Sequence, residues 1–408
     1  MSLAPSAEPR GHDRALVAWL SLAQLVTWGS TFYTFALLME PIERELGFSR
    51  AQSSLAFSIA LLAEGLCGYA VGRWIDAGHE RRVMTAGSLL VGVALLAHSA
   101  VQSLAGFYLV WALLGAGMAA TLYAPVFAIV TRRFPMDFRR AIITMTFLGG
   151  LASTVFIPLS AWLIAELGWR HALWALAALQ FALCAPLHAR WLRNAPRAAP
   201  HAAGDDADGA RAASVSQHMR SAPFVLIGVF VVCMMAVTAA LPPHLITLLR
   251  EAGLSEAWVI VIPASIGVIQ VVGRLLLYFF EHRFNVHWAN ALIPCLIPLG
   301  LAMLLAGRGH AALGLLFVLL FGLGNGLITI VKGTAIAQYV NRTHVATLNG
   351  ALGLPQALAR AAAPFALGVL WSPQGGYASG LWMLLLCSLL AVLALWTAQR
   401  ASMRAKRG

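Results

Sequence analysis

The sequence predicts an all-α membrane protein in which twelve transmembrane helices form two pseudo-symmetric six-helix bundles. The composition is the first of three observations that predict this fold. The 408 residues are 60% hydrophobic and 11% charged, whereas roughly 25% of the residues in a soluble domain are charged. The second observation is a series of apolar runs, since about 20 helical residues suffice to cross a bilayer. The third is an internal repeat.

The apolar runs form two sets of six. The first set lies at residues 15–39, 52–72, 83–102, 105–131, 141–166 and 171–191, and the second at 222–248, 257–280, 288–306, 311–339, 346–371 and 379–398. Residues 192–221 are rich in Ala, Gly, Asp and Arg without a hydrophobic period, which predicts a flexible linker. We therefore expect an N-terminal bundle at 1–191, a linker at 192–221, and a C-terminal bundle with its tail at 222–408.

The basic residues predict the orientation in the membrane. With the N-terminus inside, most arginines fall in inner loops, and few fall outside: Arg44, Arg50, Arg170, Arg250 and Arg308. Because basic loops stay in the cytoplasm, both termini and the linker are expected there. The preference for Arg over Lys, with abundant Ala, suggests a GC-rich genome and hence the cytoplasmic (inner) membrane of a bacterium.

Three pairs of segments recur at nearly one offset. Glu45–Ser49 precedes the second span and Glu251–Ser255 precedes the eighth. The stretch GAGMAATLYAPVFAIV, which starts at Gly115, matches GLGNGLITIVKGTAIA from Gly322. Likewise, Pro158 in the fifth span corresponds to Pro364 in the eleventh. Such a repeat predicts duplicated halves with a binding site between them near the bilayer midplane.

The loop after the second span reads GRWIDAGHERR from Gly72. It resembles the signature between spans 2 and 3 of the major facilitator superfamily. Gly72, Asp76, Arg81 and Arg82 match that signature, while Ala77 stands where a basic residue is usual. With twelve spans and a central linker, the resemblance covers almost the whole chain. It implies a secondary transporter in which the four matching residues form an inner-side conformational latch.

Three pieces resemble one branch of that superfamily, the monocarboxylate porters and oxalate:formate antiporters. They are FALLMEPIERELGFSRAQ from Phe35, RRFPMDFRRA from Arg132, and the Gly273–Leu275 triplet around Arg274. This resemblance implies an organic anion as the substrate, with Arg274 at its binding site. Proton-coupled members of the branch often carry a lysine in the first span, where this chain has Tyr33.

Four charged residues lie inside the predicted spans, namely Glu64, Arg274, Lys332 and Arg360. Three positive charges against one negative charge do not compensate each other in a medium of low dielectric constant. A bound anion, most simply a carboxylate, would supply the counter-charge. The planar guanidinium group suits such a ligand because it can donate two parallel hydrogen bonds.

Each charged residue also has a structural interpretation. Arg274 and Lys332 could extend to the inner membrane surface, as long basic side chains often do. Arg360 could pair with Glu64, because the resembled superfamily places spans 2 and 11 side by side. Glu64 could instead carry a proton. His244 could titrate as well, although its place near the outer end of the seventh span favours a solvated histidine.

Uncharged residues complete the predicted site. Tyr33, Tyr123 and Asn325 are expected to line it, and Gln24 is a further polar group at membrane depth. Tyrosines in membrane helices also serve as packing residues or interface anchors, so both interpretations stay open.

The predicted function is secondary active transport of a mono- or dicarboxylate by alternating access, through antiport or proton symport. The expected partners are this small organic anion, protons if they are coupled to transport, and the lipid bilayer. The chain is expected to be a monomer. The alternatives are a proton-coupled exporter of drugs or metabolites, with Glu64 as its acidic residue, and a sensor or scaffold that does not transport.

Several classes of function are excluded. The net charge of +12 does not indicate nucleic-acid binding, because the basic residues lie between apolar spans and form no continuous face. No phosphate-binding loop appears, so ATP hydrolysis does not drive the protein. The five cysteines are far apart within apolar spans, which predicts neither a disulfide framework nor a metal site. No cofactor and no enzymatic activity are expected.

Overall fold

The computed structural model describes residues 11–134, 138–193, 217–280, 285–307, 310–340, 348–349 and 351–405. The first half contains α1 (Gly11–Thr27), η1 (Trp28–Tyr33), α2 (Phe35–Leu46), α3 (Arg50–Asp76), α4 (Glu80–Ser99), α5 (Leu104–Thr121), α6 (Tyr123–Arg133), α7 (Phe138–Gly150), α8 (Ala152–Leu179), η2 (Gln180–Cys184) and α9 (Ala185–Trp191). The second half contains α11 (Ala222–Glu251), α12 (Glu256–Phe280), α13 (Val286–Leu292), η4 (Ile293–Cys295), α14 (Leu296–Ala306), α15 (Ala311–Tyr339), α17 (Gly353–Val369) and α18 (Ala378–Ala405).

The helices confirm the predicted membrane fold. Within the described residues, 10 helical stretches are long and apolar enough to cross a membrane. One of them, Thr144–Trp191, contains most of the predicted fifth span and all of the sixth, and Gly168, with a φ of 77°, separates the two. The predicted eleventh span contains α17, which has 17 residues.

The first span runs further than predicted. Its helical backbone continues through α2 to Leu46 and ends at Gly47, which has a φ of 71°. Gly253, with a φ of 84°, lies one residue after Ala252, the C-cap of α11. Glycine is favoured at such positions because it adopts a left-handed φ without a steric penalty. The two glycines belong to the repeated segments, so the repeat reproduces a helix end in each half.

Local sequence also fixes where the next helix begins. The Ser49 side chain accepts a hydrogen bond from the backbone N–H of Gln52, and the Gln52 side chain accepts one from the backbone N–H of Ser49. This reciprocal capping box satisfies two amide groups that a helix start leaves without partners. Ser103 and Ser221 cap α5 and α11 through their hydroxyl groups.

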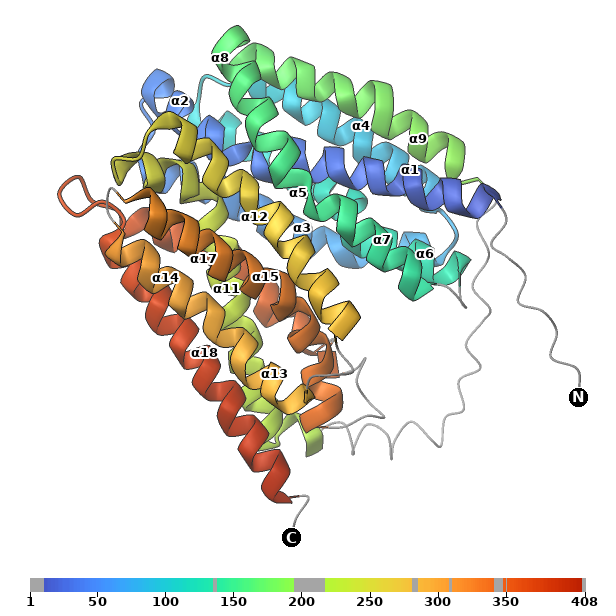
Figure 1. Cartoon of the computed structure of the whole chain (residues 1–408). Coiled ribbons are helices and arrows are strands. Elements are labelled where there is room, and N and C mark those ends of the chain that lie inside the picture. Colours follow the sequence, from blue (N-terminus) through green and yellow to red (C-terminus); the bar gives the residue numbers. More distant parts are fainter. Residues whose placement is uncertain are drawn as a thin grey trace, which may run out of the picture.

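The helices gather into two bundles (Figure 1). Helices α1–α9, blue to green, pack together, and α11–α18, yellow-green to red, form the second group. One large hydrophobic cluster belongs mainly to the second group, and two others belong mainly to the first. The segment between the bundles includes residues outside the described ranges, so the predicted boundaries at 191 and 222 stay a prediction.

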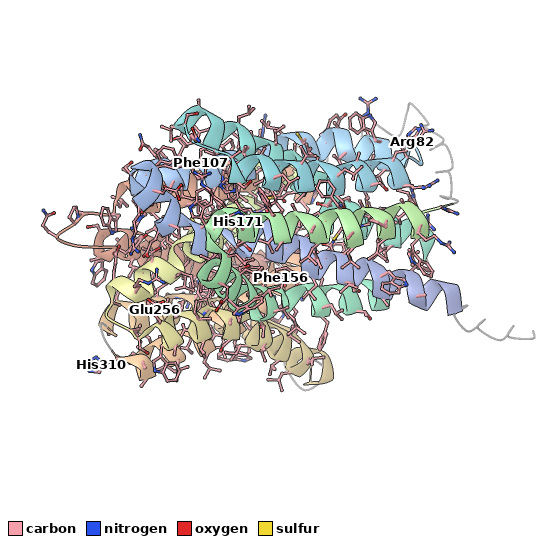
Figure 2. The ribbon with its side chains drawn as sticks, turned by 90° about the horizontal axis from the view of Figure 1, so that it is seen from above. Arg82, Phe107, Phe156, His171, Glu256 and His310 are labelled. Atoms are coloured by element: carbon pink, nitrogen blue, oxygen red, sulfur yellow. The ribbon has the colours of Figure 1, made fainter. Side chains whose placement is uncertain are left out.

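The molecule has two ends that differ in chemistry. Arg82 lies at one end, and Glu256 and His310 lie at the other (Figure 2). We call the first the Glu80 end, after the ion pairs that Glu80 forms there with Arg132 and Arg133. We call the second the Arg50 end, after the ion pair between Arg50 of α3 and Glu251 of α11. The Arg50 end is therefore tied across the two halves.

Candidate functional site

A small, partly open cavity of about 30 Å³ lies between the two halves. Tyr33, Ala36 and Ile157 line it from the first half, and residues of α11, α12 and α15 line it from the second. Its lining is mostly apolar, with polar groups from Tyr33, Gln270 and Asn325. A largely apolar pocket with a few convergent polar groups is typical of a small-molecule site.

Tyr33 reaches the cavity from a π-helical segment. The backbone N–H of Thr34 donates to Gly29 O at 3.1 Å, and the Thr34 hydroxyl donates to the same oxygen at 2.8 Å. A single π turn of this kind inserts an extra residue into a helix and is frequent at functional sites. The first span therefore changes its helical register at the point where Tyr33 meets the cavity.

Arg274 continues the cavity-facing side of α12. Gln270 lines the cavity, and Arg274 lies one helical turn further along the same face. Its Nε donates to the backbone oxygen of Gly326 at 3.3 Å, and its Nη1 donates to that of Thr146 at 3.1 Å. Thr146 belongs to α7, so this guanidinium group links the two halves.

The hydrogen bonds of Arg274 are made inside the protein, which speaks against extension to the membrane surface. The charge of Arg274 also acts electrostatically on the hydroxyl groups of Tyr33 and Tyr123. Tyr123 packs beside Trp28 at a ring-centroid distance of 5.1 Å and stacks on Phe127. It is absent from the cavity lining that the described residues form. Of the two tyrosines expected to line the site, Tyr33 therefore lines the cavity and Tyr123 does not.

Lys332 occupies the corresponding position on α15. Asn325 lines the cavity, and Lys332 lies two helical turns further along the same face. Its ammonium group is 3.7 Å from the sulfur of Met235 on α11 and experiences the charge of Arg360. No carboxylate of the described residues lies within ion-pairing distance of Lys332 or Arg274. Two cations thus extend the cavity lining toward the Glu80 end.

Arg360 and Glu64 form the alternative that the sequence left open. Arg360 Nη2 lies 3.4 Å from Glu64 Oε2, and the two side chains are 32% and 18% exposed. Their helices, α17 and α3, pack closely, since a Cβ on Gly65 would lie 3.1 Å from that of Ala357. Each charge is compensated by the other, so Arg274 and Lys332 are the cations of the predicted spans that have no carboxylate partner among the described residues.

Two polar residues differ in role from the sequence-based expectations. Gln270 lines the cavity but was not singled out, although an amide one turn before Arg274 was a visible signal. Gln24 is buried within the first bundle, where its Nε2 donates to the backbone oxygen of Thr121 at 2.6 Å. Gln24 therefore ties α1 to α5 and does not line the cavity.

The expectation that His244 is solvated is wrong. The side chain is 0% exposed, with Nδ1 2.9 Å from Tyr377 Oη and Nε2 2.9 Å from Pro364 O. The segment before α18 brings Tyr377 over the end of α11, which removes the histidine from water.

The residues of the predicted latch do not bring the two halves together in the described structure. Arg81 donates to Ala189 O at 2.7 Å within the first half, and Arg82 is exposed. Gly72 lies in α3 with open space beside it, and the side chain of Asp76 lies outside the described residues. Glu80 at this end, which sequence reasoning missed, is buried and forms ion pairs with Arg132 and Arg133.

The fold and the site together define a polytopic membrane transporter with a central binding cavity. The chain belongs to the Major Facilitator Superfamily, whose family model matches residues 20–364. As members of this family are secondary transporters, the chain is a transporter and not an enzyme. The predicted branch, with monocarboxylate porters and oxalate:formate antiporters, stays a prediction.

Solved structures support the same fold. A mutant of the nucleoside transporter NupG has a TM-score of 0.75 and 16% identity, covering 94% of this chain and 99% of that one. A bacterial homologue of the human lysosomal transporter Spinster, in an inward-facing unoccupied conformation, has a TM-score of 0.72 and 16% identity, covering 97% and 98%. A bacterial homologue of the human drug peptide transporters PepT1 and PepT2 has a TM-score of 0.69 and 13% identity, covering 95% and 99%. No curated protein matches the chain.

Proposed function

We propose that the chain transports a small organic anion, a mono- or dicarboxylate, by alternating access and by antiport or proton symport. The observation that carries this proposal is the pair of uncompensated cations beside the cavity. Arg274 and Lys332 have no carboxylate partner among the described residues, whereas Arg360 has Glu64. An anionic substrate offsets the cost of keeping two unpaired positive charges away from bulk water.

Arg274 provides a physical link between binding and conformational change. Its Nη1 donates to the neutral backbone oxygen of Thr146 in the other half. A carboxylate is a stronger acceptor, because hydrogen bonds between two charged groups are roughly twice as strong as neutral ones. A bound carboxylate would draw the guanidinium group from Thr146. Binding would then exchange a contact between the halves for a contact with substrate.

The predicted orientation assigns a state to the structure. If both termini are cytoplasmic, the Arg50 end faces outward and the Glu80 end faces inward. Ion pairs between the halves then close the outer side, with Arg50 bonded to Glu251 and Arg250 bonded to Glu40. We therefore assign a state that is closed at its outer side to a monomer in a bacterial inner membrane.

The test is counterflow of radiolabelled mono- and dicarboxylates in proteoliposomes. Removing one partner of a buried, hydrogen-bonded charge pair costs about 2–5 kcal/mol, and about 1.4 kcal/mol is a factor of ten. Arg274→Gln should therefore weaken half-saturation at least about 30-fold. The matched control is Arg44→Gln, since the Arg44 side chain is 79% exposed. Wild-type transport by Arg274→Gln would remove the basis of this site.

The two rival functions give different results. An exporter of lipophilic cations needs an uncompensated acidic residue, but Glu64 is paired with Arg360. Stabilisation of the protein by lipophilic cations and not by carboxylates, in a thermal-shift assay, would favour that exporter. A sensor or scaffold would be stabilised by a carboxylate but would show no counterflow. The structural neighbours share less than a fifth of their sequence with this chain, so their substrates are not transferred to it.

A further inference from the structure

A buried polar network joins the two halves at the Arg50 end. The Nε of Arg50 donates to both oxygens of Glu43 at 3.0 Å. Its Nη1 donates to Glu251 Oε1 at 3.2 Å and to Tyr377 Oη at 2.6 Å. Glu43 belongs to the first half, as Arg50 does, whereas Glu251 and Tyr377 belong to the second. Tyr377 Oη in turn contacts His244 Nδ1.

The partners of this network determine where its protons lie. Pro364 O is only an acceptor, so His244 Nε2 must carry the hydrogen that bonds to it. Burial raises the pKa of the Tyr377 hydroxyl, which therefore keeps its proton. Because Tyr377 Oη already accepts from Arg50, its own hydrogen points to His244 Nδ1. His244 Nδ1 must then be the acceptor, so the histidine is neutral in this conformation.

We propose that His244 is a proton-binding site that controls closure of the Arg50 end. When the histidine is neutral, it accepts the Tyr377 hydroxyl, and Tyr377 in turn accepts the Arg50 guanidinium group across the two halves. A proton on Nδ1 turns this acceptor into a donor, and the Tyr377 hydroxyl hydrogen then has no acceptor on the histidine. Closure therefore requires the proton to leave His244, whereas opening removes Arg50 from Tyr377, so that the Tyr377 oxygen can accept from a protonated ring.

The surrounding charges favour the neutral form in the closed conformation. Arg50 of α3 is the charged side chain that acts electrostatically on His244, and it has the same sign as a protonated histidine. Glu43 of α2 and Glu251 of α11 both point their oxygens at Arg50. The α17 helix contributes only the backbone oxygen of Pro364. The nearby Arg250 is occupied by Glu40 and Glu256.

This inference rests on alternating access, but not on the identity of the substrate. Its test uses the full chain without substrate, so a failure of the carboxylate proposal leaves the test intact. Two exposed residues at the Arg50 end, Gln102 of the first half and Gln374 of the second, are replaced by cysteine for spin labels. The five native cysteines are replaced by serine. Pulsed electron paramagnetic resonance then measures the distance distribution between the two labels.

The measurement is made at about pH 8 and about pH 5.5, on either side of the ordinary histidine titration. If the closed conformation cannot bind this proton, the ratio of open to closed molecules rises up to about tenfold for each pH unit below the ordinary histidine pKa. The wild-type network should therefore show one short distance at the higher pH and a growing population of longer distances at the lower pH.

The matched variant is His244→Gln, whose amide can accept from Tyr377 and donate to Pro364 O but does not titrate in this range. It should stay closed at both pH values. Glu43 and Glu251 are retained in it, so any response that belongs to the carboxylates remains visible. Tyr377→Phe is the second variant and should be more open at the higher pH. An unchanged pH response in His244→Gln, or none in the wild type, would overturn the proposal.

Discussion

Gly267 offers a sharp test of how the two halves fit together. It lies in α12, against the junction of α7 and α8 in the other half. A Cβ at this position would lie 2.6 Å from Gly150 O, 2.6 Å from Ser153 Oγ and 2.6 Å from Thr154 Oγ1. The first of these atoms belongs to the backbone, and Thr154 Oγ1 already donates to Ala264 O at 2.6 Å. Gly267→Ala therefore requires α12 to move away from α7 and α8.

The size of the effect follows from overpacking. Inserting a methyl group into a closely packed contact costs about 1–3 kcal/mol. Here the strain is relieved when the halves separate, so the cost falls on the conformation described above and not on the opened one. A difference of this size changes a two-state ratio by about 5- to 150-fold. We expect spin labels at positions 102 and 374 to report a larger open population in Gly267→Ala at about pH 8.

Gly353→Ala is the control, because Gly353 begins α17 and a Cβ there would meet nothing within 4 Å. It should leave the distance distribution unchanged. The reasoning would be refuted if Gly267→Ala kept the wild-type distribution and the wild-type thermal stability. Both results together would mean that α12 and α7 can absorb the methyl group without separating.

Two further predictions concern ion pairs. Glu80→Gln leaves Arg132 and Arg133 without their carboxylate. Because loss of one partner of a buried pair costs about 3–5 kcal/mol, the midpoint of thermal unfolding in detergent should fall clearly. A midpoint no lower than that of the exposed control Arg82→Gln would contradict this. The double variant Glu64→Gln, Arg360→Gln removes one charge of each sign, so carboxylate half-saturation in counterflow should change far less than in Arg274→Gln. An equal loss in the two would place Arg360 in the binding site.

The fold was predictable because its signals are local. Apolar runs, the glycines at positions 47 and 253, and the serine at position 49 each act on their own helix. The excess of positive charge was also visible, since Arg274 and Lys332 stand alone in apolar sequence. The cavity residues Tyr33 and Asn325 were named from the same runs. The assignment of these residues to substrate binding stays a prediction.

The partners of these residues were less accessible to sequence reasoning. Arg274 donates hydrogen bonds to the backbone oxygens of Gly326 and Thr146. Because every residue carries a backbone oxygen, the sequence does not show which residues accept such bonds. His244 is buried by Tyr377, which lies far along the chain and follows a turn with no hydrophobic period. Glu80 lies directly before Arg81, but its partners Arg132 and Arg133 are 52 and 53 residues further along the chain, so their pairing is not visible in the sequence.

The arrangement of charges implies an asymmetric cost of moving between states. Among the described residues, the ion pairs of Glu80 with Arg132 and Arg133 stay within the first half, so opening at that end breaks neither of them. Opening at the Arg50 end breaks the ion pairs Arg50–Glu251 and Arg250–Glu40 and the hydrogen bond from Arg50 to Tyr377. Partly exposed ion pairs contribute about 0–1 kcal/mol each and a hydrogen bond to a charged group about 1.5–3 kcal/mol, so these contacts together hold the end closed by at most about 5 kcal/mol. A carboxylate on Arg274, at about 2–5 kcal/mol, is of the same size as that difference and can offset it, provided that it binds the two states unequally.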